Sequence, residues 1–206
     1  MSPVQAVWFD LGGVFLDWDP RYLYRKFFGD DTQAMEHFLS VVCPPDWHAE
    51  QDRGRPIAEA CAERKALYPE YAQLIDAWEA RAEEMIKGVI PGTVEVFAEL
   101  RLAGVSCYAL SNMERENWER RYQIYDFLRL FDGYFISALE GVIKPDLAYF
   151  EKALPKLGFS GPDVFFVDDR PVNVEAARAC GIDAEVFCDA GRLREDLVLR
   201  RLLPAA

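Results

Sequence analysis

The segment 4–14 constrains the fold most, because a short apolar run within it ends abruptly at a carboxylate that two glycines follow. The run is rich in β-branched and aromatic residues, which favours a strand buried on both faces of a parallel sheet. Asp10 then lies at the carboxyl end of this strand, the edge where open α/β sheets form their binding sites. Gly12 and Gly13 allow a sharp turn and the close approach of a ligand. Taken alone, Asp10 is equally well explained as a residue that starts a turn through its side-chain oxygen.

The later part of the chain alternates strand-like and helix-like segments, which is typical of a parallel, doubly wound sheet. The further predicted strands cover residues 105–110, 134–136, 164–167 and 184–187. The predicted helices cover residues 93–103, 114–132, 147–157 and 171–180, and a last one follows residue 192. We therefore expect an α/β fold with five main strands.

One block interrupts this alternation, since residues 21–87 are helical in pattern and contain no convincing strand. Apolar residues recur at helical spacing over residues 71–86 and predict one long helix. Ile57 and Cys61 predict a partner helix that begins after Pro56. We expect an all-helical insertion after the first strand. The predicted division is a core of residues 1–17 and 88–206 and an insertion of residues 18–87.

Composition limits the partners of the 206-residue chain. Its formal net charge of −12 argues against a nucleic-acid binder, which needs a basic surface to neutralise phosphates. No segment is long and apolar enough to cross a membrane, and the apolar start is too short for a signal peptide. The five cysteines, an odd number without a Cys-x-x-Cys pair, favour free thiols in a reducing compartment. We expect a cytoplasmic monomer or homodimer that binds neither nucleic acid nor membrane.

Polar groups follow four of the predicted strands, and parallel strands bring their carboxyl ends to one edge of the sheet. These groups are Asp10, the pair Ser111 and Asn112, Lys144, and the pair Asp168 and Asp169. Clustered carboxylates repel one another unless a cation lies among them. Because only oxygen ligands are offered, the cation would be Mg²⁺ rather than zinc.

The same set suits phosphoryl transfer. A metal held by Asp10 and Asp169, with Lys144 and Ser111 opposite, would neutralise and hold phosphoryl oxygens while a carboxylate attacks in line. Each piece also has a purely structural explanation, such as a helix cap at Ser111. The occurrence of all of them in order, each at a strand end, favours the functional interpretation.

With these motifs the sequence resembles the haloacid dehalogenase-like hydrolases along essentially its whole length. The matching segments are residues 9–14, 110–112 and 144–146, and residues 167–169 with Asn173. The insertion resembles the helical cap of the subgroup whose cap follows the first motif, which includes bacterial sugar-phosphate phosphatases and the phosphatase domain of soluble epoxide hydrolases. The resemblance implies a Rossmann-like core in which the strand ending at Asp10 lies between the second and fourth strands.

The resemblance also implies a nucleophile, a metal site and a substrate. Asp10 would become an aspartyl phosphate during hydrolysis of a phosphate monoester. Asp10, the backbone carbonyl of Gly12 and Asp169 would hold Mg²⁺. The substrate would be a small phosphorylated metabolite such as a sugar phosphate.

The remaining motif residues would hold the phosphoryl group. Ser111 and the backbone of Asn112 would bind its oxygens, and Lys144 would balance their charge. Asp168 would orient Lys144 or a metal-bound water, and Asn173 would stand in for a further acid of the family pattern.

Gly12 departs from that pattern. Most phosphatases of the family carry an Asp two residues after the nucleophile, which protonates the leaving group and activates water; such help is worth roughly 10²–10⁴-fold in rate. The chain would therefore be a phosphatase that is slow or borrows another group, a 2-haloacid dehalogenase, or a catalytically silent phosphate-binding or interaction module. Retention of Asp168 and Asp169, which attack on carbon does not need, favours metal-assisted phosphoryl transfer.

The insertion offers candidates for the missing acid. Residues 47–50 and 52–54 fall in the predicted connection between its helices, a region that in this family faces the active site. His48 titrates near neutral pH, and Glu50 does so if desolvated. Arg53 is a candidate substrate contact, as are Trp18 and Trp47, although packing explains the tryptophans better.

A last segment, residues 113–121, alternates in charge and predicts a solvated helix face. The alternative is that this face meets the insertion through Arg115 and Trp118.

Overall fold

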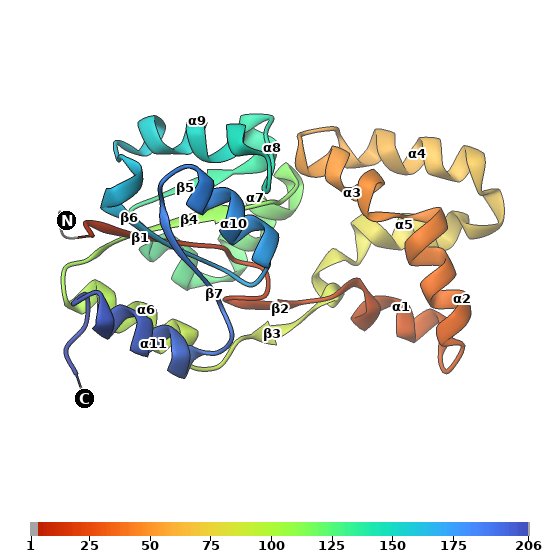
Figure 1. The fold of residues 1–206 in the computed structure, drawn as a ribbon. Helices are drawn as coiled ribbons and strands as arrows, with labels where there is room; N and C mark the ends of the chain where they lie inside the picture. The colour runs from red at the N-terminus through yellow and green to blue at the C-terminus, as the bar shows by residue number, and fades with distance from the viewer. Residues whose placement is uncertain (1–3, 206) are drawn as a thin grey trace.

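The structure, a computed structural model, describes residues 4–205 and contains a five-stranded parallel sheet with a helical insertion at one end (Figure 1). The strand order is β5-β4-β1-β6-β7. The strands are β1 (Ala6–Phe9), β4 (Ser106–Ser111), β5 (Gly133–Ile136), β6 (Val164–Asp168) and β7 (Asp183–Val186). The predicted α/β fold is confirmed, and β1 lies between β4 and β6, as the family resemblance implies.

Helices cover both faces of this sheet because side chains of a strand point alternately to opposite faces. Val7 and Phe9 of β1 join the core on the face covered by α6 and α11, whereas Ala6 and Trp8 join the core on the face of α9 and α10 (Figure 1). The helices of the core are α6 (Thr93–Leu102), α7 (Arg115–Ile124), α8 (Ser137–Glu140), α9 (Leu147–Leu157), α10 (Pro171–Ala179) and α11 (Ala190–Leu199). The sheet is thus buried on both faces, and its carboxyl edge is left for a site.

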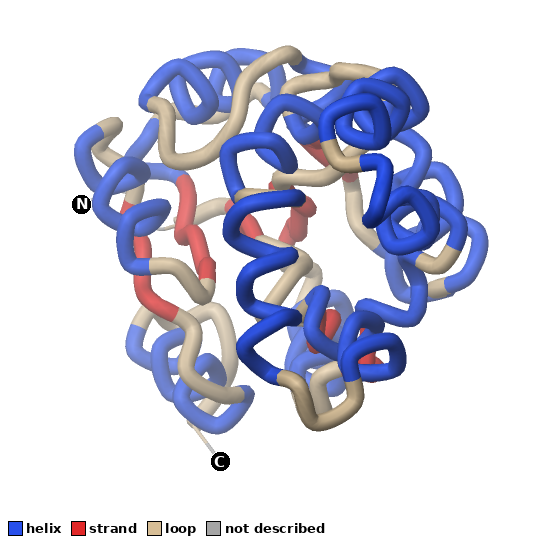
Figure 2. The backbone as a smooth tube through the Cα atoms, turned by 90° about the vertical axis from the view of Figure 1, so that its right-hand side faces the viewer, coloured by secondary structure: helices blue, strands red, loops and turns tan. Residues whose placement is uncertain are grey.

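The insertion has an apolar core of its own, which includes Tyr24, Phe38, Trp47 and Trp78. Its helices are α1 (Pro20–Phe28), α2 (Thr32–His37), α3 (Pro45–Asp52), α4 (Ile57–Leu67) and α5 (Ala72–Ala80). Seen from the side of the insertion, these helices lie in front of the strands of the core (Figure 2). The predicted partner helix after Pro56 is α4.

The predicted long helix over residues 71–86 is wrong. Helix α5 ends at Ala80, a 3₁₀ turn covers Ala82–Met85, and the chain continues into strand β3 (Ile86–Val89). β3 pairs in antiparallel fashion with β2 (Leu16–Trp18), so the predicted absence of a strand up to residue 87 also fails. The helical spacing is overridden because β2 offers these residues a hydrogen-bonding partner that the sequence alone does not reveal.

Two further expectations concern the environment of the chain. Within residues 4–205, no helix combines the length and apolar character needed to span a membrane. All five cysteines fall in this range and are free thiols.

Candidate active site

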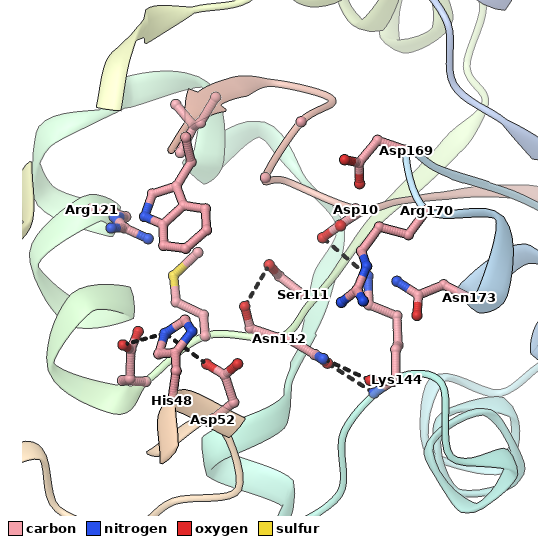
Figure 3. Close-up of a pocket in the computed structure, with 16 residues that line it drawn as sticks. Asp10, His48, Asp52, Ser111, Asn112, Arg121, Lys144, Asp169, Arg170 and Asn173 are labelled. Atoms are coloured by element: carbon pink, nitrogen blue, oxygen red, sulfur yellow. Dashed lines mark hydrogen bonds and ion pairs between the residues drawn. The ribbon is translucent and has the colours of Figure 1, made fainter. Parts of the chain in front are cut away.

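A cavity of about 340 Å³ opens at the carboxyl edge of the sheet, between the core and the insertion (Figure 3). The predicted site residues that line it are Asp10, Gly12, His48, Ser111, Asn112, Lys144, Asp169 and Asn173. They come from the ends of β1 and β4, the loop after α8, the segment after β6, the first turn of α10, and α3. The structure therefore brings the four strand-end motifs together.

Lys144 is a buried cation in this cavity and forms ion pairs with two carboxylates. Its side chain is 1% exposed, and its Nζ lies 3.1 Å from Asp10 Oδ1 and 2.6 Å from Asp168 Oδ2. Nζ also donates a hydrogen bond to the carbonyl oxygen of Leu110, 2.9 Å away. Burial would lower the pKa of Lys144, but Asp10 and Asp168 outweigh burial and raise it. Lys144 is therefore a buried ammonium group held between two carboxylates.

Asp168 positions that ammonium group and is itself held by hydrogen bonds. It is fully buried and accepts hydrogen bonds from Asn173 Nδ2 at 2.9 and 3.0 Å and from the Arg170 amide at 2.9 Å. The backbone of Lys144 is fixed by Asn112, whose amide side chain both accepts from its N–H and donates to its carbonyl. Both ion-pair partners of Lys144, Asp10 and Asp168, are among the site residues proposed from the sequence.

The donor set fits a hard divalent cation. Carboxylate oxygens of Asp10, Asp168 and Asp169 lie within 4.8 Å of one another. Burial raises the pKa of Asp10 to about 7; Lys144 opposes the rise, and Asp168 and Asp169 add to it. Burial and then Asp168 also raise the pKa of Asp169. A cation among these oxygens would relieve their repulsion, and oxygen ligands of this kind suit Mg²⁺.

Gly13 provides a test of that cation site. It has φ of +69°, and a Cβ there would overlap the Asp169 carboxylate. We expect Gly13→Ala to displace Asp169 and to weaken Mg²⁺ binding at least tenfold in titration calorimetry, in addition to a backbone penalty above about 1 kcal/mol. Gly104→Ala is the control, because Gly104 has a similar φ of +76° and no described atom lies within 4 Å of its Cβ position. Equal Mg²⁺ affinities in the two variants would contradict this arrangement.

A second polar cluster on the wall made by the insertion and α7 is only partly predicted by the sequence. His48 Nε2 lies 2.8 Å from Glu114 Oε1 and 3.9 Å from Asp52 Oδ1. The His48 ring stacks on Trp18, with ring centroids 5.7 Å apart. Arg121 is also buried in this wall. His48 and Trp18 are sequence candidates, and Asp52 falls in the segment 52–54 that the sequence offers for the missing acid without being singled out. Glu114 and Arg121 are not candidates.

The other candidates from the insertion lie elsewhere. Residues 47–50 and Asp52 belong to helix α3 rather than to a connection. Glu50 is exposed and pairs with Arg55 at 2.5 Å, so it is not brought to the cavity. Arg53 forms an exposed ion pair with Asp146 at 3.2 Å and bridges the insertion to the core. Trp47 is buried within the core of the insertion and is a packing residue.

The predicted solvated face of residues 113–121 is wrong. The buried positions Glu114, Asn117, Trp118 and Arg121 follow the spacing of one helix face, a signal that could have identified it. Trp118 packs into the core rather than against the insertion, and Arg115 is exposed. The contact with the insertion comes instead from the neighbouring arginines: Arg120 donates to the Glu79 carbonyl at 3.5 Å, and Arg121 pairs with Glu83 at 3.4 Å.

His48 makes the stability of the protein depend on pH. Burial would lower the pKa of His48, but Asp52 and Glu114 outweigh burial and raise it from 6.5 to about 9. The stability that His48 contributes is thus fully present below pH 6.5 and is lost as the pH rises through about 9. We expect the melting temperature of the wild type to fall across that interval relative to His48→Gln in thermal melts followed by circular dichroism. His37→Gln, at the exposed second histidine, should follow the wild type; parallel curves for all three proteins would contradict the prediction.

Comparisons with known proteins agree with this fold. The chain is 28% identical to the sesquiterpene phosphatase astK of Aspergillus oryzae over 86% of its own length and 87% of that protein. A HAD-like family hydrolase from Porphyromonas gingivalis superposes with a TM-score of 0.74 at 18% identity, covering 98% of each chain. A HAD family enzyme from Bacteroides thetaiotaomicron in complex with magnesium and inorganic phosphate gives a TM-score of 0.70 at 20% identity, covering 90% of this chain and 95% of that one. The sequence model for haloacid dehalogenase-like hydrolases matches residues 4–181, and the chain belongs to that family.

Proposed function

We propose that this hydrolase cleaves small phosphate monoesters through an aspartyl phosphate at Asp10. The observation that carries the proposal is the carboxylate of Asp10, which lies 3.1 Å from the buried ammonium group of Lys144 and shares a cavity with Ser111 and Asp169. This combination offers a nucleophile beside cationic groups that neutralise a phosphoryl group. The relative from Aspergillus oryzae is named a phosphatase, which supports the same reaction.

Asp10, the backbone carbonyl of Gly12 and Asp169 are the proposed ligands of Mg²⁺. When bound, Mg²⁺ would supply positive charge next to the phosphoryl oxygens. Magnesium and phosphate in the related Bacteroides enzyme support this assignment.

The other core residues bind and orient the phosphoryl group. The hydroxyl of Ser111, the backbone amide of Asn112 and the ammonium group of Lys144 hold its oxygens. Asp168 and Asn173 keep Lys144 in place. We propose sugar phosphates or similar metabolites as substrates, and the half-buried Trp18 at the cavity wall offers such a ligand an apolar surface. A cytoplasmic location and a monomeric or homodimeric state remain predictions from the sequence.

The experiment that tests the function is release of inorganic phosphate, with and without Mg²⁺, from a panel of sugar phosphates and one activated aryl phosphate. Metal-dependent release that Asp10→Asn abolishes would support the proposal. Binding of phosphate without turnover of any substrate would contradict it and favour the silent binding module.

A second assay addresses the dehalogenase alternative. Because carboxylates grouped around a cation site are not needed for attack on carbon, we expect no halide release from 2-haloacids in the absence of Mg²⁺. Robust turnover in an ion-selective electrode assay without metal would overturn the phosphatase proposal.

A further inference from the structure

Hydrolysis of a phosphate ester requires a group that protonates the leaving oxygen and later accepts a proton from water. The position two residues after the nucleophile cannot supply it, since Gly12 has no side chain. The group must lie in the same cavity as Asp10, on the far side of the bound phosphoryl group. That side is the wall formed by α3 and the residues at the start of α7 (Figure 3).

Asp52 is the carboxylate of that wall that makes no side-chain hydrogen bond among the described residues. It is the last residue of α3, it is 7% exposed, and it lines the cavity that contains Asp10. Its Oδ1 is fully buried and has no hydrogen-bond partner within residues 4–205. A buried carboxyl oxygen without a partner is costly unless a ligand or a proton satisfies it. Figure 3 shows Asp52 across the cavity from Asp10.

The charged groups that face Asp52 make their shorter contacts with other residues, and Arg121 pairs with Glu83. His48 is on the same helix, Glu114 and Arg121 come from the α7 side, and Lys144 comes from the loop after α8. Glu114 accepts hydrogen bonds from His48 and from Asn117 Nδ2 at 3.0 Å, and Lys144 lies between two carboxylates.

Glu114, His48 and Asp52 differ in their protonation state near neutral pH. Burial would raise the pKa of Glu114, but His48 and Arg121 outweigh it and lower the pKa to about 2, so Glu114 stays ionised. His48, with a pKa of about 9, stays cationic near neutral pH. Burial raises the pKa of Asp52 to about 6; Glu114 adds to the rise, while His48, Arg121 and Lys144 oppose it. Asp52 thus exchanges a proton near neutral pH, as an acid–base catalyst must.

We infer that Asp52, supplied by the insertion, is the general acid and general base of the reaction. The inference rests on the proposed phosphatase function. As an oxygen of Asp10 bonds to phosphorus and the ester P–O bond breaks, the leaving oxygen takes the electron pair and the proton of the Asp52 carboxyl group. Asp52, now ionised, then takes a proton from water while the water oxygen bonds to phosphorus. The P–O bond to Asp10 breaks, inorganic phosphate leaves, and Asp52 is again protonated.

His48 and Glu114 are positioning residues in this scheme. The ionised Glu114 holds the His48 ring at 2.8 Å, and Trp18 stacks on that ring. The cationic ring lies 3.9 Å from Asp52 and stabilises the carboxylate that remains after proton donation. The insertion and the core therefore build the acid–base group jointly.

The experiment compares Asp52→Asn with the wild type on two substrates in the presence of Mg²⁺. One is an alkyl phosphate, such as a sugar phosphate that the wild type hydrolyses, and the other is 4-nitrophenyl phosphate, whose leaving group departs without a proton. We expect kcat on the alkyl phosphate to fall about 10²–10⁴-fold. On the aryl phosphate we expect a burst of about one equivalent of nitrophenol followed by slow turnover, because Asp10 is phosphorylated but water is not activated.

Glu59→Gln is the matched control, since it neutralises an exposed carboxylate on the neighbouring helix α4 and should leave both activities unchanged. Unchanged activity of Asp52→Asn would overturn the inference. So would an equal loss on both substrates without a burst. Absence of phosphate release by the wild type would instead contradict the proposed function itself.

A wild-type measurement keeps the inference testable if Asp52→Asn does not fold. The acid must be protonated for an alkyl leaving group, so kcat/KM for the alkyl phosphate should fall above pH about 6 more steeply than kcat/KM for the aryl phosphate. Superimposable pH profiles for the two substrates would contradict a role for Asp52 as the acid.

Discussion

Asp10→Asn is expected to abolish metal-dependent phosphate release, with kcat lowered by at least about 10⁴-fold, as for removal of other catalytic nucleophiles. An amide oxygen does not attack phosphorus as a carboxylate does, so no aspartyl phosphate can form. The amide is isosteric with the carboxylate and retains an oxygen that accepts the hydrogen bond from the Leu11 amide at 2.7 Å. The variant should therefore fold as the wild type does.

The measurement is phosphate release under single-turnover and steady-state conditions, with circular dichroism as the check on folding. Asp126→Asn is the control, because it makes the same chemical change at a side chain that is 90% exposed. Retention of more than about 1% of wild-type activity by Asp10→Asn would show that another group attacks phosphorus.

The carboxyl edge of the sheet, which carries the candidate site, can largely be predicted from the sequence because each of its parts is local. The apolar run before Asp10, the pair Ser111 and Asn112, and Lys144 each follow a strand, and strand ends of a parallel sheet converge whatever the loops between them do. The family resemblance implies that Asp168 orients Lys144 or a metal-bound water, and the two side chains form an ion pair at 2.6 Å.

The residues of the opposite wall of the cavity cannot be predicted from the sequence in the same way. His48 and Asp52 lie four residues apart on α3, but their partner Glu114 precedes α7, on the other side of the cavity. That contact depends on how the insertion lies over the core, which no local pattern encodes. The alternating charge of residues 113–121 predicts a solvated face for Glu114 and Arg121, whereas both side chains are buried in contacts with His48 and Glu83 of the insertion. The break of the predicted helix at Ala80 has the same origin, since β3 forms only because β2 is beside it.

Substitution of Lys144 is expected to have the second large effect, because Lys144 contributes both to the stability of the protein and to the proposed reaction. Lys144→Met removes the cation from between Asp10 and Asp168 and leaves two buried carboxylates facing each other. Removal of one partner of a buried ion pair typically destabilises a protein by about 3–5 kcal/mol. We expect a loss of this size in the free energy of unfolding from urea titrations at pH 7 without Mg²⁺, together with loss of phosphate release.

The matched control is Lys156→Met, at a half-exposed lysine that pairs with Glu140. Pairs of that kind contribute about 0–1 kcal/mol, so the control should remain close to the wild type. The deficit of Lys144→Met should shrink as the pH falls, because protonation of Asp10, whose pKa burial raises to about 7, removes the repulsion that the variant creates. A deficit that is small at pH 7, or that does not change with pH, would mean that Lys144 does not stabilise the two carboxylates. The ammonium group of Lys144 would then serve only to bind the phosphoryl group.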